Sequence, residues 1–261
     1  MRRALTAIAL IAVAVYLVFW AHSMVFAGAA VCMGFLCYWE YSGLVAAHGI
    51  ARPGWFGIAA GILVVLWPEE AVIGLMLLTA FALTLALGSA DLKSVLPRVS
   101  AGLLGTIYAF MPWHFAVLLR SESVHWLFFA LALNWAGDTV AYYAGRRFGK
   151  HALAPVVSPS KTWEGAAASV LGSIVFGVAY ISYFMPQVPW WHVAGIAVIG
   201  NVAGQCGDLA ESAMKRGAGV KDSGHMLPGH GGMLDRVDSS LFALPVVYIL
   251  SVLSGYASVN G

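Results

Sequence analysis

A short charged segment near the C-terminal end carries the residues best suited to chemistry. Within 24 positions it holds seven of the chain's 26 charged residues, which are 14 Lys and Arg with 12 Asp and Glu. The seven are Lys215, Arg216, Lys221, Asp222, Asp235, Arg236 and Asp238. Cations can clamp phosphoryl oxygens, carboxylates can hold Mg²⁺, and glycines let backbone N–H groups approach an anion. The segment therefore predicts a site for a polyphosphate and its metal ion.

A polar face leads along the preceding apolar stretch into this segment. At about 100° per residue, five residues project to one side of a helix. They are Asn201, Gln205, Asp208, Ser212 and Lys215. Hydrogen bonding between membrane helices would account for Asn201 or Gln205, but a carboxylate at 208 needs a cation. One or two carboxylates with substrate phosphates commonly hold Mg²⁺, so we expect Asp208 and Asp235 to bind this ion together.

Two features beside Asp235 leave alternatives open. Asp238 could bind the ligand, or it could cap the next helix, because acidic residues are favourable at a helix N-terminus. His230-Gly231-Gly232 permits a tight anion-binding turn, although an ordinary glycine loop would have the same sequence. We do not expect His230 to bind zinc, because no Cys or His cluster accompanies it.

A second charged stretch, residues 138–165, joins two apolar runs. Lys161-Thr162 is similar to the lysine–hydroxyl pair of a P-loop, but the upstream glycine spacing is absent. This stretch could be a basic loop that only fixes the membrane topology, or it could bind a ligand. We expect this stretch to close over the same ligand as residues 208–238. Its candidate binding residues are Asp138, Lys161 and Glu164.

The composition predicts an integral membrane protein. The chain is 61% hydrophobic and 10% charged, with a mean hydropathy of +0.82, whereas soluble domains carry roughly 25% charged residues. A net charge of +2 is too small to favour nucleic acid, and three cysteines in apolar stretches do not predict a disulfide framework. A spanning helix needs about 20 mostly apolar residues. Nine runs are candidates: 4–20, 24–46, 54–67, 71–90, 99–119, 123–144, 165–184, 188–208 and 239–257.

The distribution of Lys and Arg favours nine crossings. With a cytoplasmic N-terminus and each run crossing once, 13 of the 14 Lys and Arg lie inside and only Arg120 lies outside. The short run 54–67 could instead be re-entrant, and the first 20 residues could be a signal peptide. We expect one all-α membrane domain over residues 1–261, with its C-terminus outside. Pro112 and Pro245 fall inside runs and predict kinks.

Five carboxylates map toward the cytoplasmic ends of these runs. They are Glu40, Asp138, Glu164, Asp208 and Glu211. Ionisable groups in a membrane span are costly and usually face a protein or water cavity where they serve function. Any one of these carboxylates could instead lie at a helix end that is exposed to water. Because all five map to the same side of the membrane, a shared functional site is favoured. Such a site beside membrane helices indicates nucleotide chemistry performed on a lipid.

Residues 212–238 resemble the signature of the bacterial phosphatidate cytidylyltransferase family over all 27 positions. Asp138-Thr139 with Gly145-Arg146, and residues 158–165, are similar to further family segments. Ser160 departs from the pattern, which has a lysine there, but Lys161 follows it. The resemblance implies that CTP and phosphatidic acid give CDP-diacylglycerol and pyrophosphate, the committed step of bacterial phospholipid synthesis. It implies Mg²⁺, allows a second cation such as K⁺, and implies a homodimer in the bacterial inner membrane with its active site on the cytoplasmic side.

The resemblance places the metal-binding aspartates on Asp208 and Asp235, with Ser212 and Lys215 beside them as catalytic residues. A phosphate monoester is largely dianionic near neutral pH, so it needs little help from a general base. The residues expected to bind the nucleotide and its phosphates are Lys161, Arg216, Lys221, Asp222, His230, Gly231, Gly232, Arg236, Asp238, Asp138 and Glu164.

Other functions would use similar residues. A lipid-alcohol kinase would also consume CTP but would release CDP, and a CDP-archaeol synthase would act on a different lipid. A secondary transporter predicts charges near the membrane midplane and repeated halves. The acids of this chain gather at one side and the sequence shows no repeat, so a transporter is disfavoured.

Overall fold

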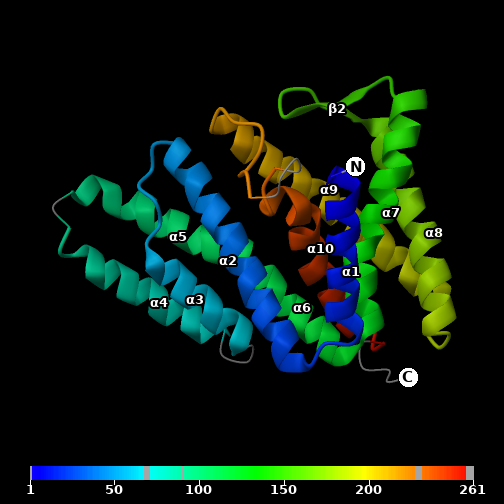
Figure 1. Cartoon of the computed structure of the whole chain (residues 1–261), viewed down its shortest axis with the longest axis horizontal. Coiled ribbons are helices and arrows are strands. Elements are labelled where there is room, and N and C mark those ends of the chain that lie inside the picture. Colours follow the sequence, from blue (N-terminus) through cyan, green and yellow to red (C-terminus); the bar gives the residue numbers. More distant parts are fainter. Residues whose placement is uncertain (1, 68–70, 90, 227–230, 257–261) are drawn as a thin grey trace. The chain divides into compact units, whose positions relative to one another are not determined.

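The computed structural model describes residues 2–67, 71–89, 91–226 and 231–256 (Figure 1). Over these residues the chain forms ten α-helices, one short 3₁₀ helix and one β-hairpin. The helices are α1 (Arg2–Phe19), α2 (Ser23–Ala47), α3 (Trp55–Leu66), α4 (Ala71–Ala86), η2 (Leu92–Ser94), α5 (Val95–Ala109), α6 (Met111–Glu122), α7 (Val124–Phe148), α8 (Trp163–Phe184), α9 (Trp190–Gly217) and α10 (Leu234–Leu253).

The chain divides into two compact units, which we describe separately. Unit 1 comprises Met1–Val117 and Met214–Arg236, and unit 2 comprises Leu118–Ala213 and Val237–Gly261. Helices α9 and α10 contribute residues to both units.

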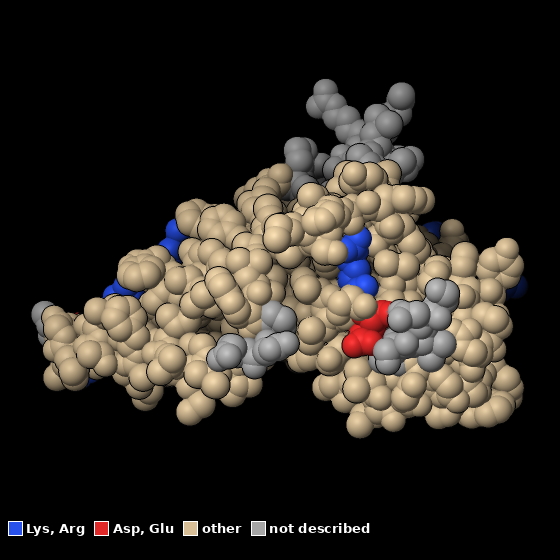
Figure 2. Space-filling model, turned by 90° about the horizontal axis from the view of Figure 1, so that it is seen from below, with Lys and Arg blue, Asp and Glu red and all other residues tan. Residues whose placement is uncertain are grey.

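The helices are those of a membrane protein. Within the described residues, five helical stretches are long and apolar enough to cross a bilayer: Ser23–Ala47, Leu92–Glu122 (η2, α5 and α6 taken together), Trp163–Phe184, Trp190–Gly217 and Leu234–Leu253. Two shorter apolar helices cover Trp55–Leu66 and Val72–Ala86. On the face drawn in Figure 2, Lys, Arg, Asp and Glu side chains cover only small areas, as a surface in contact with lipid requires. Nine crossings and the sides of the two termini stay predictions.

Most apolar runs become helices close to their expected bounds, but the fifth run breaks in two. Helix α5 ends at Ala109 and α6 begins at Met111, so the predicted kink at Pro112 is confirmed as a break at Phe110. Proline has no N–H group to continue the helix, and its fixed φ suits the first turn of a new one. Pro245 lies inside α10 without ending it.

Close helix contacts at glycines build unit 1. A Cβ atom at Gly57 would collide with the Tyr38 hydroxyl, and one at Gly61 would collide with the Phe110 ring. Only glycine allows α2, α3 and the α5–α6 break to approach so closely. The Tyr41 hydroxyl donates to the carbonyl of Ala101 at 3.1 Å and fixes α2 against α5.

A buried amide network holds α8 and α9 together in unit 2. The amide nitrogen of Asn201 donates to Ser169 Oγ at 3.1 Å and to Ser173 Oγ at 2.8 Å. Gln205 Nε2 donates to the carbonyl of Ala166 at 3.2 Å and to Asn201 Oδ1 at 2.7 Å. The interhelical hydrogen bonding that the sequence allowed for Asn201 and Gln205 is therefore present. At these two residues, the polar face of α9 serves to bind α8.

A β-hairpin interrupts the expected all-α fold between α7 and α8. Strands β1 (Ala152–Ala154) and β2 (Ser158–Thr162) pair antiparallel, with Ala152 opposite Thr162 and Ala154 opposite Ser158. Thr162 then caps α8, its hydroxyl accepting from the N–H of Gly165 at 3.1 Å. The hairpin thus carries Lys161 at a fixed distance from the start of a membrane helix.

Candidate active site

The predicted site residues gather in two charged clusters, one in each unit. We name them after their aspartates. The Asp235 cluster, in unit 1, contains Glu40, Lys215, Ser223, Gly232 and Asp235. The Asp208 cluster, in unit 2, contains Asp138, Lys161, Asp208 and Ser212.

Asp235 is the best-supported carboxylate of unit 1. Its Oδ1 lies 2.5 Å from Lys215 Nζ, and the two side chains are only 6% and 10% exposed. Its Oδ2 accepts from the N–H of Gly232 at 2.8 Å and from the N–H of Ser223 at 3.0 Å, and the Ser223 hydroxyl lies 3.0 Å away. A buried ion pair is tolerated only when its remaining atoms are hydrogen-bonded. These contacts therefore hold Asp235 in one orientation at the start of α10, where the helix dipole also favours negative charge.

Glu40 of α2 holds the turn that precedes Asp235. Its side chain is buried, with 4% of the residue exposed. Oε1 accepts from the N–H of Met233 at 2.9 Å, and Oε2 accepts from the N–H of Leu234 at 2.8 Å. Ser223 Oγ lies 2.9 Å from Oε2 and 3.0 Å from Asp235 Oδ2, so its single proton is donated to one or the other carboxylate. Two N–H groups of this turn thus depend on one carboxylate from a distant helix. Glu40 positions Asp235. The sequence placed it among five carboxylates expected to share a site, but not among the residues expected to bind the metal ion or the nucleotide.

The turn itself requires its two glycines. Gly231 has a φ of 78°, in the left-handed region that side chains disfavour. A Cβ atom at Gly232 would collide with Ser223 Oγ and Glu40 Oε2. The glycines therefore let the turn donate its N–H groups to buried carboxylates. His230, expected to begin this turn, lies outside the described residues.

The Asp208 cluster joins three elements of unit 2. Lys161 Nζ, from β2, lies 2.5 Å from Asp208 Oδ2, and the two side chains are 29% and 28% exposed. Ser212 Oγ donates to Asp208 Oδ1 at 3.4 Å from the next turn of α9. Asp138 of α7 interacts electrostatically with both Asp208 and Lys161. The structure therefore brings the stretch 138–165 to the end of α9, as one ligand site would require.

The remaining basic and acidic candidates lie at the surface. Arg216 donates from Nη1 to the carbonyl of Val220 at 2.9 Å and so closes the turn after α9. Lys221, Asp222 and Arg236 are exposed, and the described residues give their side chains no hydrogen-bond or ion-pair partner. Such side chains can turn toward a ligand without breaking a contact.

Two acidic candidates have structural contacts. The Glu164 carboxylate accepts from the N–H groups of Lys150 and His151 at 3.1 and 3.3 Å, and it pairs with His151 Nδ1 at 2.6 Å. It therefore fastens the hairpin to α8. Asp238 lies in the second turn of α10, beyond the first turn where capping occurs, and its Oδ1 accepts from the N–H of Ser239 at 2.7 Å.

The donor set suits Mg²⁺ better than a metal that needs a dense ligand cage. In the part of the chain that the structure describes, no three His, Cys, Asp or Glu side chains are grouped as metal ligands. Mg²⁺ needs only one or two carboxylates when substrate phosphates complete its coordination. Lysine ammonium groups lie 2.5 Å from Asp208 and from Asp235, so a metal ion at either carboxylate would share it with a lysine.

The fold defines an integral membrane protein with two clusters of paired lysines and carboxylates. The chain belongs to the cytidylyltransferase family, whose sequence model matches residues 1–254, and it is accordingly a nucleotidyltransferase.

Among similar proteins, the phosphatidate cytidylyltransferase of Staphylococcus aureus (strain COL) is 36% identical over 203 residues, which is 75% of this chain and 78% of the relative. The protein of the same name from Staphylococcus saprophyticus is 38% identical over 201 residues, or 74% and 77% of the two chains. That of Staphylococcus epidermidis is 44% identical over 133 residues, or 51% of each.

Proposed function

We propose that this chain transfers the cytidylyl group of CTP to phosphatidic acid, forming CDP-diacylglycerol and pyrophosphate. The observation that carries the proposal is the family match over residues 1–254, which contains every residue of both clusters. The names of the Staphylococcus relatives support the lipid substrate. Paired lysines and carboxylates also suit a nucleotide triphosphate better than a neutral ligand.

In this reaction a phosphate oxygen of phosphatidic acid attacks the α-phosphorus of CTP. A new P–O bond forms as the bond between the α-phosphorus and the bridging oxygen breaks, and pyrophosphate leaves with the electron pair. Because the attacking monoester is already largely dianionic at neutral pH, the chain need not supply a general base. Catalysis depends instead on in-line positioning and neutralisation of charge.

The residues of the two clusters have distinct tasks in this mechanism. Lys161 and Lys215 bring ammonium groups to the phosphates, and the exposed Lys221 and Arg236 can approach the leaving pyrophosphate. Bound Mg²⁺ supplies Lewis-acid stabilisation of the phosphoryl oxygens. Asp235 is held rigidly for ligand binding by the Glu40 turn.

We also propose that Asp208 and Asp235 hold the same Mg²⁺ ion. Asp208, Ser212 and Lys215 occupy positions i, i+4 and i+7 of the continuous helix α9, which are spaced to share one face. Lys215 is the residue that binds Asp235. Helix α9 therefore carries one proposed ligand and the partner of the other.

The cellular setting belongs to the same proposal. A bacterial inner membrane, an active site on the cytoplasmic side, a homodimer and a second cation such as K⁺ follow from the family resemblance. The five long apolar helices support a multi-pass membrane location.

A product assay tests the proposed reaction against its closest rivals. Purified protein in mixed micelles, given CTP, Mg²⁺ and dioleoyl phosphatidic acid, should form CDP-diacylglycerol and pyrophosphate in equal amounts. Diacylglycerol in place of phosphatidic acid should give neither product. Release of CDP from a lipid alcohol would instead identify a kinase, and turnover confined to ether-linked archaeal lipid would identify a CDP-archaeol synthase.

Glu40→Ala is expected to lower turnover more than tenfold. The substitution leaves the N–H groups of Met233 and Leu234 without their acceptor, and each such loss costs about 1–3 kcal/mol. A loosened turn would misplace Asp235. Pyrophosphate release should fall while the protein still inserts into the membrane.

Two further variants make this test specific. Glu40→Gln keeps one carbonyl oxygen and should recover part of the lost turnover. Glu122→Ala makes the same change at the end of α6, where the described residues give Glu122 no hydrogen bond, and should behave as wild type. Full activity in Glu40→Ala would show that the turn does not position the site.

A further inference from the structure

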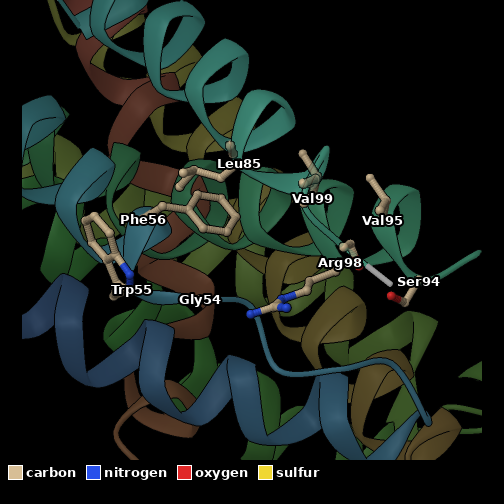
Figure 3. Close-up of a pocket in the computed structure, with 12 residues that line it drawn as sticks. Gly54, Trp55, Phe56, Leu85, Ser94, Val95, Arg98 and Val99 are labelled. Carbon is tan, nitrogen blue, oxygen red and sulfur yellow. The ribbon is translucent and has the colours of Figure 1, made fainter. Parts of the chain in front are cut away.

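A cavity of about 300 Å³ lies within unit 1, between α3, α4 and the start of α5 (Figure 3). Its apolar walls include Trp55, Phe56, Leu85 and Val99. The cavity shares no residue with the Asp208 or Asp235 cluster. Its volume is at the lower end of the range typical of small-ligand sites, roughly 300–1,000 Å³. It can therefore hold a headgroup with the first part of an acyl chain.

The cavity is also lined by a basic residue, Arg98, which is exposed. Within the described residues its guanidinium makes no hydrogen bond or ion pair. In Figure 3 its side chain extends toward the backbone at Gly54, and Nη2 lies 3.6 Å from the position that a Cβ atom of Gly54 would occupy. By contrast, the nearby Arg52 stacks on the Trp39 ring at 5.9 Å. Arg98 is thus available to an anion that enters the cavity.

The start of α5 adds to this positive field. Ser94 occupies the N-cap position and lines the cavity, but its side chain makes no capping hydrogen bond. Its hydroxyl donates instead to the carbonyl of Asp91 at 2.9 Å. The N–H of Val95 already donates to the carbonyl of Leu92, and Pro97 has no N–H, so the start of α5 contributes chiefly through the helix dipole, which favours negative charge. Arg98 lies in the first turn of the same helix, so both features favour an anion at one end of the cavity.

The apolar walls decide which anion fits. Trp55 is 68% exposed and Leu85 54% exposed, so the cavity wall continues onto the outer surface of apolar helices. A free inorganic anion would leave this wall uncovered, whereas an acyl chain would cover it. A zwitterionic lipid would bring a second, positive group toward Arg98. The combination is complementary to a lipid that carries net negative charge.

We propose that this cavity binds an anionic phospholipid, with its phosphate on Arg98 and the start of α5 and its acyl chain against Phe56 and Leu85. The bound lipid would connect α3, α4 and α5. Because it occupies a site apart from both charged clusters, it is additional to the substrate lipid of the proposed reaction. Binding to the folded state alone would also stabilise the protein against unfolding.

Lipid binding to the full chain tests the proposal directly. The protein in neutral detergent micelles is titrated with dioleoyl phosphatidylglycerol or dioleoyl phosphatidylcholine, and bound lipid is counted by native mass spectrometry. Wild type should retain phosphatidylglycerol in preference to phosphatidylcholine. Arg98→Gln should weaken phosphatidylglycerol binding about tenfold, the effect of losing one charge-assisted contact. Arg52→Gln removes an arginine that does not line the cavity and should bind as wild type.

A second variant fills the space and keeps the charge. Ala86 lines the cavity and is half-buried, so Ala86→Phe should also reduce phosphatidylglycerol binding while the protein stays folded by size-exclusion chromatography. Equal binding by Arg98→Gln and Arg52→Gln, or by Ala86→Phe and wild type, would overturn the proposal. Displacement of the lipid by millimolar inorganic phosphate would reassign the site to a soluble anion. None of these readouts depends on turnover, so their failure would leave the proposed reaction standing.

Discussion

Asp235→Asn is expected to lower kcat/KM for CTP by about a hundred- to a thousandfold. The substitution removes one of the two carboxylates proposed to bind Mg²⁺. It also breaks the buried ion pair with Lys215, which is only 8% exposed, and breaking such a pair costs about 3–5 kcal/mol of folding stability. Each 1.36 kcal/mol lost from transition-state stabilisation is worth about tenfold in rate. Pyrophosphate release with CTP and phosphatidic acid measures the loss.

A matched aspartate separates this effect from a general loss of charge. Asp91 is exposed in unit 1 and accepts a hydrogen bond from the N–H of Lys93 at 3.1 Å, a contact that asparagine can also make. Asp91→Asn should therefore keep full activity. Wild-type turnover by a membrane-inserted Asp235→Asn protein would refute the role of Asp235.

Asp208→Asn is expected to cause a loss of the same order for a different reason. Its ion pair with Lys161 is about a quarter exposed, so the pair itself contributes little to stability. The loss should come from ligand binding and appear as a strongly raised Mg²⁺ requirement, with little change in thermal stability. A titration of activity against Mg²⁺ concentration measures this shift.

Two variants at neighbouring residues of α9, Ser212 and Cys206, serve as controls for Asp208→Asn. Ser212→Ala removes only a long hydrogen bond of 3.4 Å to Asp208 and should cost less than tenfold. Cys206→Ser changes an exposed residue two positions away and should be silent. An unchanged Mg²⁺ requirement in Asp208→Asn would exclude this carboxylate as a ligand.

The membrane helices could be predicted from sequence because long apolar runs have few alternatives to helix in lipid. The bounds of α2 and α8 fall within two residues of the predicted runs 24–46 and 165–184. The charged end of α9 was less predictable. Polar residues ended the predicted run at 208, yet the helix continues to Gly217, because backbone hydrogen bonds persist where side chains leave the apolar layer. Asp208 and Lys215 therefore lie on one helix, as the predicted polar face required, although the predicted membrane-spanning run ended at 208.

The contacts of the site could not be read from residue spacing. Glu40 binds Leu234 across 194 positions, and no local pattern specifies such a pairing. The sequence does show that Glu40 is a carboxylate within a 25-residue helix that is otherwise almost entirely apolar. Its position indicates that burying the charge is energetically costly, but it does not identify the residues that bind it. The hairpin at 152–162 was also missed, since its short strands have no alternating apolar pattern.

The measurement that tests the central claim most directly is Mn²⁺ binding in the presence of CTP, followed by electron paramagnetic resonance. If Asp208 and Asp235 share one ion, wild type binds it, and Asp208→Asn and Asp235→Asn each lose the same bound Mn²⁺. The double variant should then be no worse than the more impaired single variant, because ligands of one ion act as a unit. Retention of that ion by either single variant, or losses of activity that multiply in the double variant, would contradict a shared site.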